Sequence, residues 1–145
     1  MTSKERVVLI TGAESGIGKS TSKIFLDNGY IVIGTYLKNN NNKNTKDIEY
    51  HRIDITKSKD WENLALYIKK KFKKIDVLVN SAGVRLSGNL ETTSMSDWSY
   101  HLNNNVTGTF LACKYILPFL KKAKNSSIIN VASCLLYTSP SPRDQ

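Results

Sequence analysis

The residues from 11 to 18 have the types and spacing that phosphate binding requires. Gly12, Gly16 and Gly18 lie between an apolar run at 7–10 and a helix-like pattern that begins near Ile17. Glycine allows a sharp turn and lets a ligand approach the backbone closely. The start of a helix adds open N–H groups and the positive end of the helix dipole. This stretch therefore predicts a nucleotide-binding loop.

The spacing of the glycines discriminates between several known loops. A P-loop requires G-x-x-x-x-G-K-S/T, and Gly18-Lys19-Ser20 supplies only its end, because Ala13 occupies the place of the first glycine. The dinucleotide fingerprint G-x-G-x-x-G also fails. The observed order, G-x-x-x-G-x-G after Thr11, resembles the cofactor loop of the short-chain dehydrogenase/reductase family. A glycine-rich turn without a ligand is the alternative, since short motifs also occur by chance.

The segments that must position this loop alternate between strand and helix. Apolar runs predict strands at 6–11, 30–35, 49–53, 75–80 and 127–131. Helical spacing predicts helices at 16–28, 57–72 and 97–122. This alternation predicts an α/β fold with a parallel sheet, helices on both faces and right-handed crossovers. The resemblance implies a Rossmann-type doubly wound sheet that stops after the fifth strand, in the order 3-2-1-4-5.

Each predicted helix carries residues three and four apart that lie on one face of the helix. In the first helix these are Ile17, Thr21, Ile24 and Phe25. In the second they are Trp61, Leu64, Ala65, Ile68 and Phe72. In the third they are Leu102, Val106, Phe110, Cys113, Leu117 and Leu120.

Two further stretches resemble cofactor-contacting motifs of the same family. Asp54-Ile55 follows the third predicted strand, where the family has an aspartate that contacts adenine; a solvated strand-end turn is the alternative. Asn80-Ser81-Ala82-Gly83 resembles the family's Asn-Asn-Ala-Gly motif, with Ser81 as a departure. There the asparagine joins neighbouring strands and the small residues let the cofactor pass. The resemblance implies a cofactor site formed by Thr11, Gly12, Ser15, Gly16, Ile17, Gly18, Tyr36, Lys38, Asp54, Ile55, Asn80, Ala82 and Gly83.

Asn105 and Ser133 fall on the positions of two catalytic groups of the family. The resemblance implies that Asn105 orders water for a proton relay and that Ser133 steadies the substrate's carbonyl oxygen. The alternatives are one more Asn in an Asn-rich chain and a strand-end hydroxyl that caps backbone groups. The family also needs a Tyr-x-x-x-Lys pair after the serine, and this chain has none there, since the residue four after Tyr137 is Ser141. We therefore expect no measurable turnover from these 145 residues.

Few residues in the sequence indicate whether the cofactor is NAD or NADP. An acidic residue at the end of the second strand would bind the ribose 2′-hydroxyl and favour NAD, but Tyr36 occupies that place and Lys38 could meet a 2′-phosphate. Against NADP, Ser15 fills a loop position that is often basic in NADP-binding members, and Glu14 would repel a phosphate. These residues favour NADP slightly.

Residues 134–144 differ in character from the rest of the chain, with two prolines and no helical or strand period. They resemble the translation of a transposon-end adapter used in sequencing libraries; a natural Ser/Pro linker is the alternative. We therefore expect residues 1–133 to be a partial NAD(P)-binding domain and 134–145 a non-native, disordered tail. Such a truncation would leave the fifth strand at an open apolar edge, so we expect poor solubility. The apolar residues concerned are Ile128, Ile129 and Val131.

Composition limits the partners. The formal net charge is +9, from 21 Lys and Arg against 12 Asp and Glu, yet the lysines gather at predicted helix ends and no nucleic-acid reader motif is present. Cys113 and Cys134 lack metal or disulfide spacing. There is no signal pattern, and no apolar run approaches the ~20 residues that span a bilayer. We expect a cytoplasmic protein with no metal and no nucleic-acid or membrane partner.

Three functions are compatible with these residues. The first is an NAD(P)-dependent oxidoreductase that interconverts a carbonyl and an alcohol; the resemblance implies a small-molecule substrate and a homodimeric or homotetrameric parent. The second is a non-catalytic dinucleotide-binding sensor on the same fold, which would have no use for a proton relay through Asn105 and Ser133. The third is a P-loop nucleotide-binding protein, disfavoured by Ala13 and by the lack of a clear Mg²⁺-binding aspartate after a later strand.

Overall fold

The computed structural model describes residues 5–38, 44 and 47–133. Along the chain the elements are β1 (Arg6–Ile10), α1 (Gly16–Asp27), β2 (Tyr30–Tyr36), β3 (Ile48–Arg52), α2 (Ser58–Lys71), β4 (Val77–Asn80), α3 (Met95–His101), the π-helical segment η1 (Leu102–Thr107), α4 (Gly108–Leu120) and β5 (Ser127–Asn130). The predicted tail at 134–145 lies outside the described residues, as does most of the Asn-rich loop before β3.

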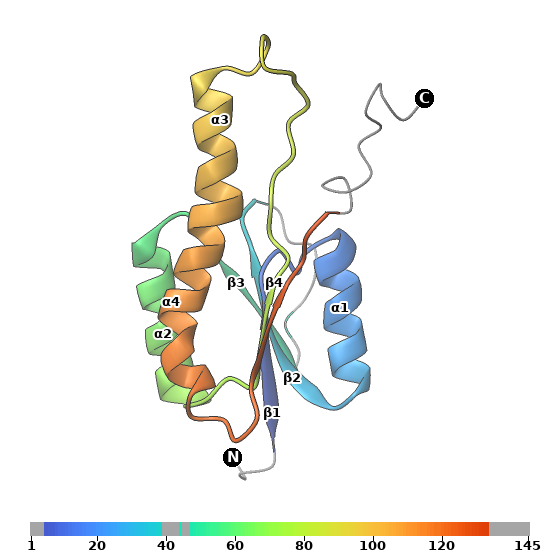
Figure 1. Ribbon diagram of the computed structural model, residues 1–145. Coiled ribbons are helices and arrows are strands. Elements are labelled where there is room, and N and C mark those ends of the chain that lie inside the picture. The colour runs from blue at the N-terminus through green and yellow to red at the C-terminus, as the bar shows by residue number, and fades with distance from the viewer. Residues whose placement is uncertain (1–4, 39–43, 45–46, 134–145) are drawn as a thin grey trace.

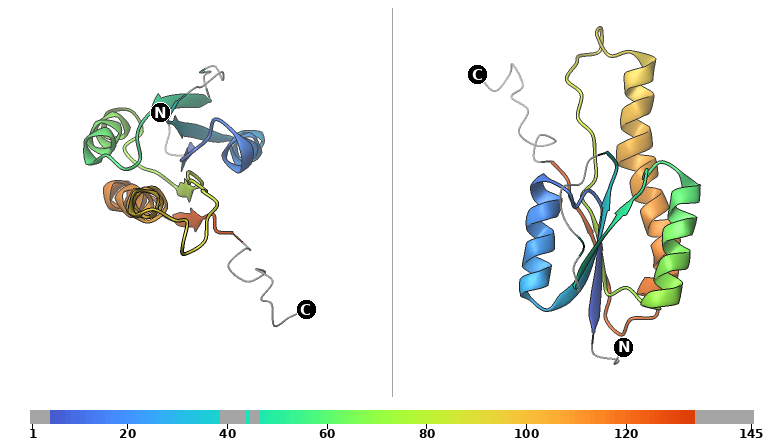
Figure 2. Two further views of the ribbon diagram at one scale, coloured as in Figure 1. Left: turned by 90° about the horizontal axis from the view of Figure 1, so that it is seen from above. Right: turned by 180° about the vertical axis from the view of Figure 1, so that it is seen from behind.

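The strands form one sheet in the order β3-β2-β1-β4-β5, and every neighbouring pair is parallel. Helix α1 lies on one face of the sheet, and α2 and α4 lie together on the other (Figures 1 and 2). The predicted Rossmann-type doubly wound α/β fold and its strand order are confirmed. The carboxyl ends of the strands therefore meet at one edge of the sheet, where ligands bind in open α/β folds.

The core has one layer on each side of the sheet, because successive side chains of a strand point to opposite faces. In β1, Val7 and Leu9 face α2 and α4, whereas Val8 and Ile10 face α1. Burial on both faces explains why the strands have nearly continuous apolar sequences. The predicted apolar positions of α2 face the core, with Trp61 and Ile68 completely buried.

The apolar faces predicted for the other two helices are only partly buried: Leu120 is buried and Cys113 packs against the core, but most of the remaining residues are exposed. The predicted helix at 97–122 consists of α3, η1 and α4, and Leu102, Val106, Phe110 and Leu117 are between 40% and 59% exposed. The face of α4 that is buried is instead formed by Leu111, Ala112, Ile116, Phe119 and Leu120. Residues 110–120 are apolar nearly all round the helix, so their spacing does not select a face, and the π-helical turn before them changes the phase.

Helix α1 departs from its prediction in the same way. Ile17 and Ile24 are each 62% exposed, and the residues of α1 that are buried against the sheet are Gly18 and Ser22. Gly18 lies directly against the loop after β1, where a Cβ would overlap Gly12, and such a close approach leaves no room for isoleucine on the inner face. Only Phe25 of the predicted apolar residues packs against the core.

The end strand β5 is poorly covered in the described part of the chain. Ile128, Ile129 and Val131 are 40% to 44% exposed, as the sequence predicted for a fifth strand at the edge of the sheet. Such an apolar edge favours association with other chains. None of the helices formed by the described residues has the length and apolarity needed to cross a membrane.

Candidate functional site

A cavity of about 580 Å³ opens at the carboxyl ends of β1, β2 and β4. Its volume lies in the range of small-molecule and cofactor sites. Of the predicted cofactor residues it is lined by Gly12, Ser15, Gly16, Ile17, Gly18, Tyr36, Lys38, Ile55, Ala82 and Gly83. Residues far apart in the sequence thus meet at one edge of the sheet.

The three glycines of the loop after β1 serve different geometric needs. Gly12 has a φ of +66°, and a Cβ there would lie 3.0 Å from the Cα of Ala82. A Cβ on Gly18 would overlap the carbonyl oxygen of Gly12, because α1 starts directly against the loop. Gly16 has a φ of +50° but faces open space. The loop therefore needs glycine for backbone conformation at two positions and for close packing at two.

The start of α1 presents its positive end to the cavity. Ser15 is the N-cap, but its side chain does not cap the helix, and the first turn carries no acidic residue. Gly16, Ile17 and Gly18 line the cavity at this end. First-turn N–H groups lack partners within the helix, so this arrangement suits an anion such as a phosphate.

Thr11 joins the two loops that border the cavity and does not itself line it. The residue is buried, and its Oγ1 accepts hydrogen bonds from the backbone N–H groups of Ser81 and Ala82, both at 3.0 Å. Its own N–H donates to the carbonyl of Val79 at 2.9 Å. Thr11 therefore fixes the turn after β4 against the glycine loop, and direct contact with a cofactor stays a prediction.

Asn80 joins β4 to β5, the tie that the resemblance implied for it. Its Nδ2 donates to Oδ1 of Asn130 at 2.8 Å, and the two residues are register partners in the sheet. The same Nδ2 lies 3.6 Å from Sγ of Cys113 on α4. Asn80 is buried, so it supports the turn that follows it from beneath the cavity.

Asn105 lies in η1 and holds the segment that follows Gly83. Its Oδ1 accepts from the N–H of Val84 at 2.8 Å, and its Nδ2 donates to the carbonyl of Val84 at 3.0 Å. A Cβ on Gly83 would come within 3.1 Å of that Oδ1, so a larger residue there would press against Asn105. The amide of Asn105 thus positions the cavity wall, and its role in a proton relay stays a prediction.

Asp54 lies at the end of β3, and its carboxylate is engaged by the turn that starts α2. Its Oδ1 accepts from the N–H and the hydroxyl of Thr56 at 3.0 and 2.7 Å, and Lys57 lies 3.6 Å from Oδ2. Burial would raise the pKa of Asp54, but the hydrogen bonds from Thr56 and the charge of Lys57 hold it below its ordinary value. The structure thus contains the strand-end turn that was the alternative interpretation of Asp54. Contact of Asp54 with adenine stays a prediction.

The cavity also has lining residues that the sequence did not single out. Tyr100 and Asn104 reach it from α3 and η1, and Nδ2 of Asn104 donates to the carbonyl of Tyr100 at 2.9 Å. Their spacing of four puts them on one face of a helix. Only the tertiary structure shows that this face meets the glycine loop. The remaining lining residues, which were not among the predicted cofactor residues, are Glu14, Thr35, Leu37, Ile53, Ser81 and Val84.

Ser133 is an exposed residue just beyond β5. It lies at the end of the described part of the chain and is not among the residues that line the cavity. Its catalytic role stays a prediction.

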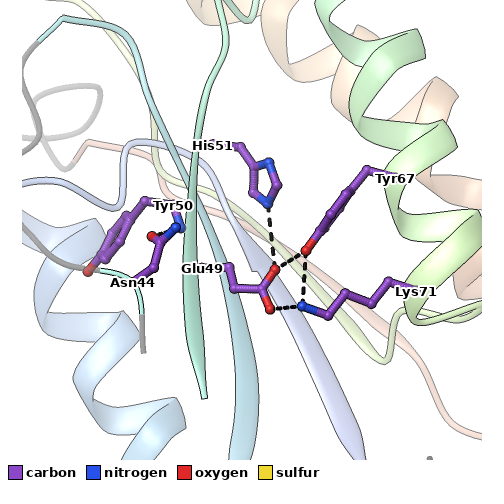
Figure 3. Close-up of polar contacts among 6 residues, drawn as sticks. All are labelled: Asn44, Glu49, Tyr50, His51, Tyr67 and Lys71. Carbon is purple, nitrogen blue, oxygen red and sulfur yellow. Dashed lines mark hydrogen bonds and ion pairs between the residues drawn. The ribbon is translucent and has the colours of Figure 1, made fainter. Parts of the chain in front are cut away.

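Tyr67 and Lys71 have the Tyr-x-x-x-Lys spacing, but they lie away from the cavity. They project from α2 toward Glu49 on β3, and both contact its carboxylate, with Lys71 Nζ 3.1 Å from the Tyr67 hydroxyl (Figure 3). Burial and the hydrogen bond to Glu49 raise the pKa of Tyr67 despite the lysine. The pair joins α2 to the sheet through Glu49, and neither residue is among those that line the cavity.

No group of three or more His, Cys, Asp or Glu side chains in the described ranges could hold a metal ion.

Comparisons with known proteins agree with this geometry. Residues 6–139 match the short chain dehydrogenase family. A 3-ketodihydrosphingosine reductase from Bacteroides thetaiotaomicron is 34% identical over 128 residues, which cover 88% of this chain and 47% of the relative. An NAD-dependent glycerol dehydrogenase from Listeria innocua is 33% identical over 138 residues, covering 89% and 53%. The chain thus spans about half the length of the curated relatives it matches.

Solved structures show the same likeness. A short chain dehydrogenase from Leptospira borgpetersenii with bound NAD+ superimposes with a TM-score of 0.86 at 25% identity, covering 96% of this chain and 56% of that one. The structure of ElxO with NADP bound has a TM-score of 0.80 at 33% identity, covering 89% and 56%. The matched family range also continues past Ser133 into residues 134–139, which the structure does not describe. With its fold, its glycine loop and this match over most of its length, the chain belongs to the short chain dehydrogenase family.

Proposed function

We propose that this chain is the dinucleotide-binding part of an NAD(P)-dependent oxidoreductase that interconverts a carbonyl and an alcohol of a small-molecule substrate. The observation that carries the proposal is the cavity bordered jointly by the glycine loop and the turn after β4. Both lie at the carboxyl edge of a doubly wound sheet, where dinucleotides bind. The NAD+ and NADP bound to the two related structures support the same class of cofactor.

The residues present fit such a cofactor. The start of α1 lacks a side-chain cap and an acidic residue, and Gly16 leaves open space where a Cβ would stand, as a pyrophosphate needs. Ile55 and Tyr36 would border the adenosine half, and Ala82 and Gly83 the nicotinamide half. A bound nicotinamide dinucleotide would supply or accept the hydride. Thr11 and Asn80 would hold the two loops in place around it.

Asn105 and Ser133 are the groups of this chain that would act on the substrate's proton and carbonyl oxygen. The general acid of the family, Tyr-x-x-x-Lys, does not follow Ser133 in this sequence. Loss of a positioned general acid typically lowers a rate by ~10²–10⁴-fold. We therefore expect the purified chain to bind cofactor without measurable ketone reduction, and turnover with NADPH or NADH would contradict this expectation.

Titration of the purified chain with NADPH, NADH and Mg²⁺-ATP, followed by fluorescence and calorimetry, tests the proposed cofactor class. We expect saturable binding of a nicotinamide dinucleotide that Gly18→Ala abolishes. Tighter binding of Mg²⁺-ATP would favour the P-loop alternative and overturn the proposal.

Within that class we favour NADP over NAD. Tyr36 and Lys38 both line the cavity, and neither offers a carboxylate to a ribose 2′-hydroxyl. We expect Lys38→Gln to weaken NADPH binding and to leave NADH binding unchanged. Lys23→Gln, which removes an exposed lysine of α1 outside the cavity, is the matched control. If Lys38→Gln lowered the affinity for NADPH and for NADH equally, that result would count against a preference for NADP.

The natural sequence after residue 133 decides whether the whole protein is a catalyst. The resemblance of 134–144 to adapter sequence supports a change from native to non-native sequence after Ser133, and the family match to residue 139 stands against it. Genomic sequencing downstream of codon 133 tests both. A Tyr-x-x-x-Lys pair there would support the enzyme, and its lack would favour the dinucleotide-binding sensor. The exposed apolar residues of η1 and α4 support a homodimeric or homotetrameric parent, which light scattering of that longer protein would test.

A further inference from the structure

The segment after β4 is tied to the neighbouring helix at two alternate residues. Asn105 binds the main chain of Val84, as described above. Four residues earlier on the same helical stretch, Nε2 of His101 accepts a hydrogen bond from the N–H of Leu86 at 2.8 Å. The next hydrogen bonds along the segment run among residues 89–93 and stay within it. Leu86 is therefore the last point at which this segment is tied to the helix before it turns back.

The bond at Leu86 requires His101 to act as an acceptor. An imidazole nitrogen accepts a hydrogen bond through its lone pair, so Nε2 carries no hydrogen where this bond is formed. His101 is half-buried and lies outside the motifs that carry the family resemblance. Its spacing of four from Asn105 places both side chains on one face, toward the segment that they hold.

This bond joins two walls of the cavity. Val84 lines the cavity from the segment after β4, and Tyr100 lines it from α3. The bond between His101 and Leu86 connects those same two stretches, one residue beyond Tyr100 and two beyond Val84. In Figure 1 the segment after β4 extends past the edge of the sheet and returns as α3. Without the bond between His101 and Leu86, the hydrogen bonds of Asn105 to Val84 would be the remaining ones between residues 84–86 and the helix in the part of the chain that the structure describes.

We propose that His101 is a positioning residue that sets the distance between the Val84 wall and the Tyr100 wall of the cavity. It acts through the backbone at Leu86 and is not among the residues that line the cavity. That these walls face the nicotinamide and the substrate rests on the proposed function. The bond itself does not, so it can be tested without any ligand.

Hydrogen–deuterium exchange of the 145-residue chain at low micromolar concentration, read by mass spectrometry in overlapping peptides, tests the bond. His101→Leu removes the acceptor, and His101→Gln keeps one at a similar reach. We expect exchange at residues 84–86 to become roughly three- to tenfold faster in His101→Leu, because one net hydrogen bond is lost. His101→Gln should return it toward the wild-type rate, which the loss of a merely space-filling ring would not do.

His51→Leu is the matched control, since it makes the same change at a histidine beside a different cavity. It should leave exchange at 84–86 unchanged. Exchange in β1 and β2 checks that each variant is folded, and if His101→Leu unfolds, the comparison of wild type with His101→Gln at 84–86 decides. Unchanged exchange in a folded His101→Leu, or exchange in His101→Gln several-fold faster than in the wild type, would overturn the proposal.

Addition of NADPH or NADH separates this proposal from the proposed function. Protection of residues 12–18 by dinucleotide supports the function, and no protection by either dinucleotide refutes it whatever His101 does. If protection occurs, we expect His101→Leu to weaken dinucleotide binding while His51→Leu does not. Equal affinity in both variants would show that the bond does not shape the cofactor side of the cavity.

Discussion

The glycine loop after β1 and the segment after β4 border the same cavity but are held by different means. The glycine loop is shaped by its own backbone: Gly12 and Gly16 have positive φ, and Gly18 allows contact with the carbonyl of Gly12. The segment after β4 has no secondary structure between β4 and α3 and is held by side chains of other elements, Thr11, Asn105 and His101. One wall is thus encoded locally and the other by distant residues.

This difference has consequences for mutation. A change in the glycine loop alters a conformation that no other residue can restore, so it should affect stability and binding together. A change at Asn105 or His101 releases a wall while the sheet beneath it remains intact, so its effect should be local. The following substitutions test this contrast.

Gly18→Ala is expected to have the largest effect. The added methyl group would overlap the carbonyl oxygen of Gly12, a backbone atom that moves only if α1 or the loop shifts. Overpacking of this kind costs about 1–3 kcal/mol of folding free energy. We expect a lower midpoint of urea unfolding and no detectable dinucleotide binding. A variant with wild-type stability and affinity would show that the loop is not shaped by this contact.

Gly16→Ala should have a smaller effect that separates strain from ligand contact. Gly16 and Gly29 both have positive φ, +50° and +75°, and in both a Cβ would face open space. Alanine at either position should therefore lose about 1–2 kcal/mol of stability through left-handed strain. Only Gly16 lines the cavity, so calorimetry should find weaker dinucleotide binding in Gly16→Ala alone. Equal affinities in the two variants would remove Gly16 from the site.

Asn105→Ala should release the segment after β4 and leave the sheet intact. It removes both bonds to Val84, each worth about 0.5–1.5 kcal/mol in net terms, at an exposed site where water replaces part of the loss. We expect faster hydrogen exchange at Val84 and a drop in global stability of only about 1 kcal/mol. Asn103→Ala, an exposed neighbour in the same η1 segment, is the control and should change neither quantity.

The smallest effect is expected away from both loops, at His51 of β3, whose ring contacts Tyr67 of α2. Burial lowers the pKa of His51 below its ordinary value of 6.5, although Glu49 acts to raise it. As the pH falls below 6.5, the unfolded chain takes up a proton at this residue before the folded chain does, so stability falls. The free energy of unfolding, measured by urea between pH 7.5 and 5.5, should decline less in His51→Gln than in the wild type. Parallel curves would contradict the depressed pKa.

Much of the fold could be predicted from the sequence because its signals are local. Continuous apolar strands such as 7–10, a glycine-bounded helix at 16–28 and the alternation of the two indicate a parallel sheet without any knowledge of contacts. The segment at 97–122 could not be resolved in the same way. Its helix is apolar nearly all round, so only the position of the sheet determines that Ile116 is buried and that Phe110 is exposed.

The candidate site also has a part that local sequence predicts and a part that depends on distant contacts. By itself, the sequence determined the glycine loop, since positive φ and the lack of a Cβ are properties of the residues at those positions. Only the tertiary structure decided that Thr11 joins two loops, that His101 holds Leu86, and that Tyr67 and Lys71 belong to a different surface. Each of these depends on which residues distant in the chain become neighbours. Local spacing carries no information about that, because packing of the whole sheet brings them together.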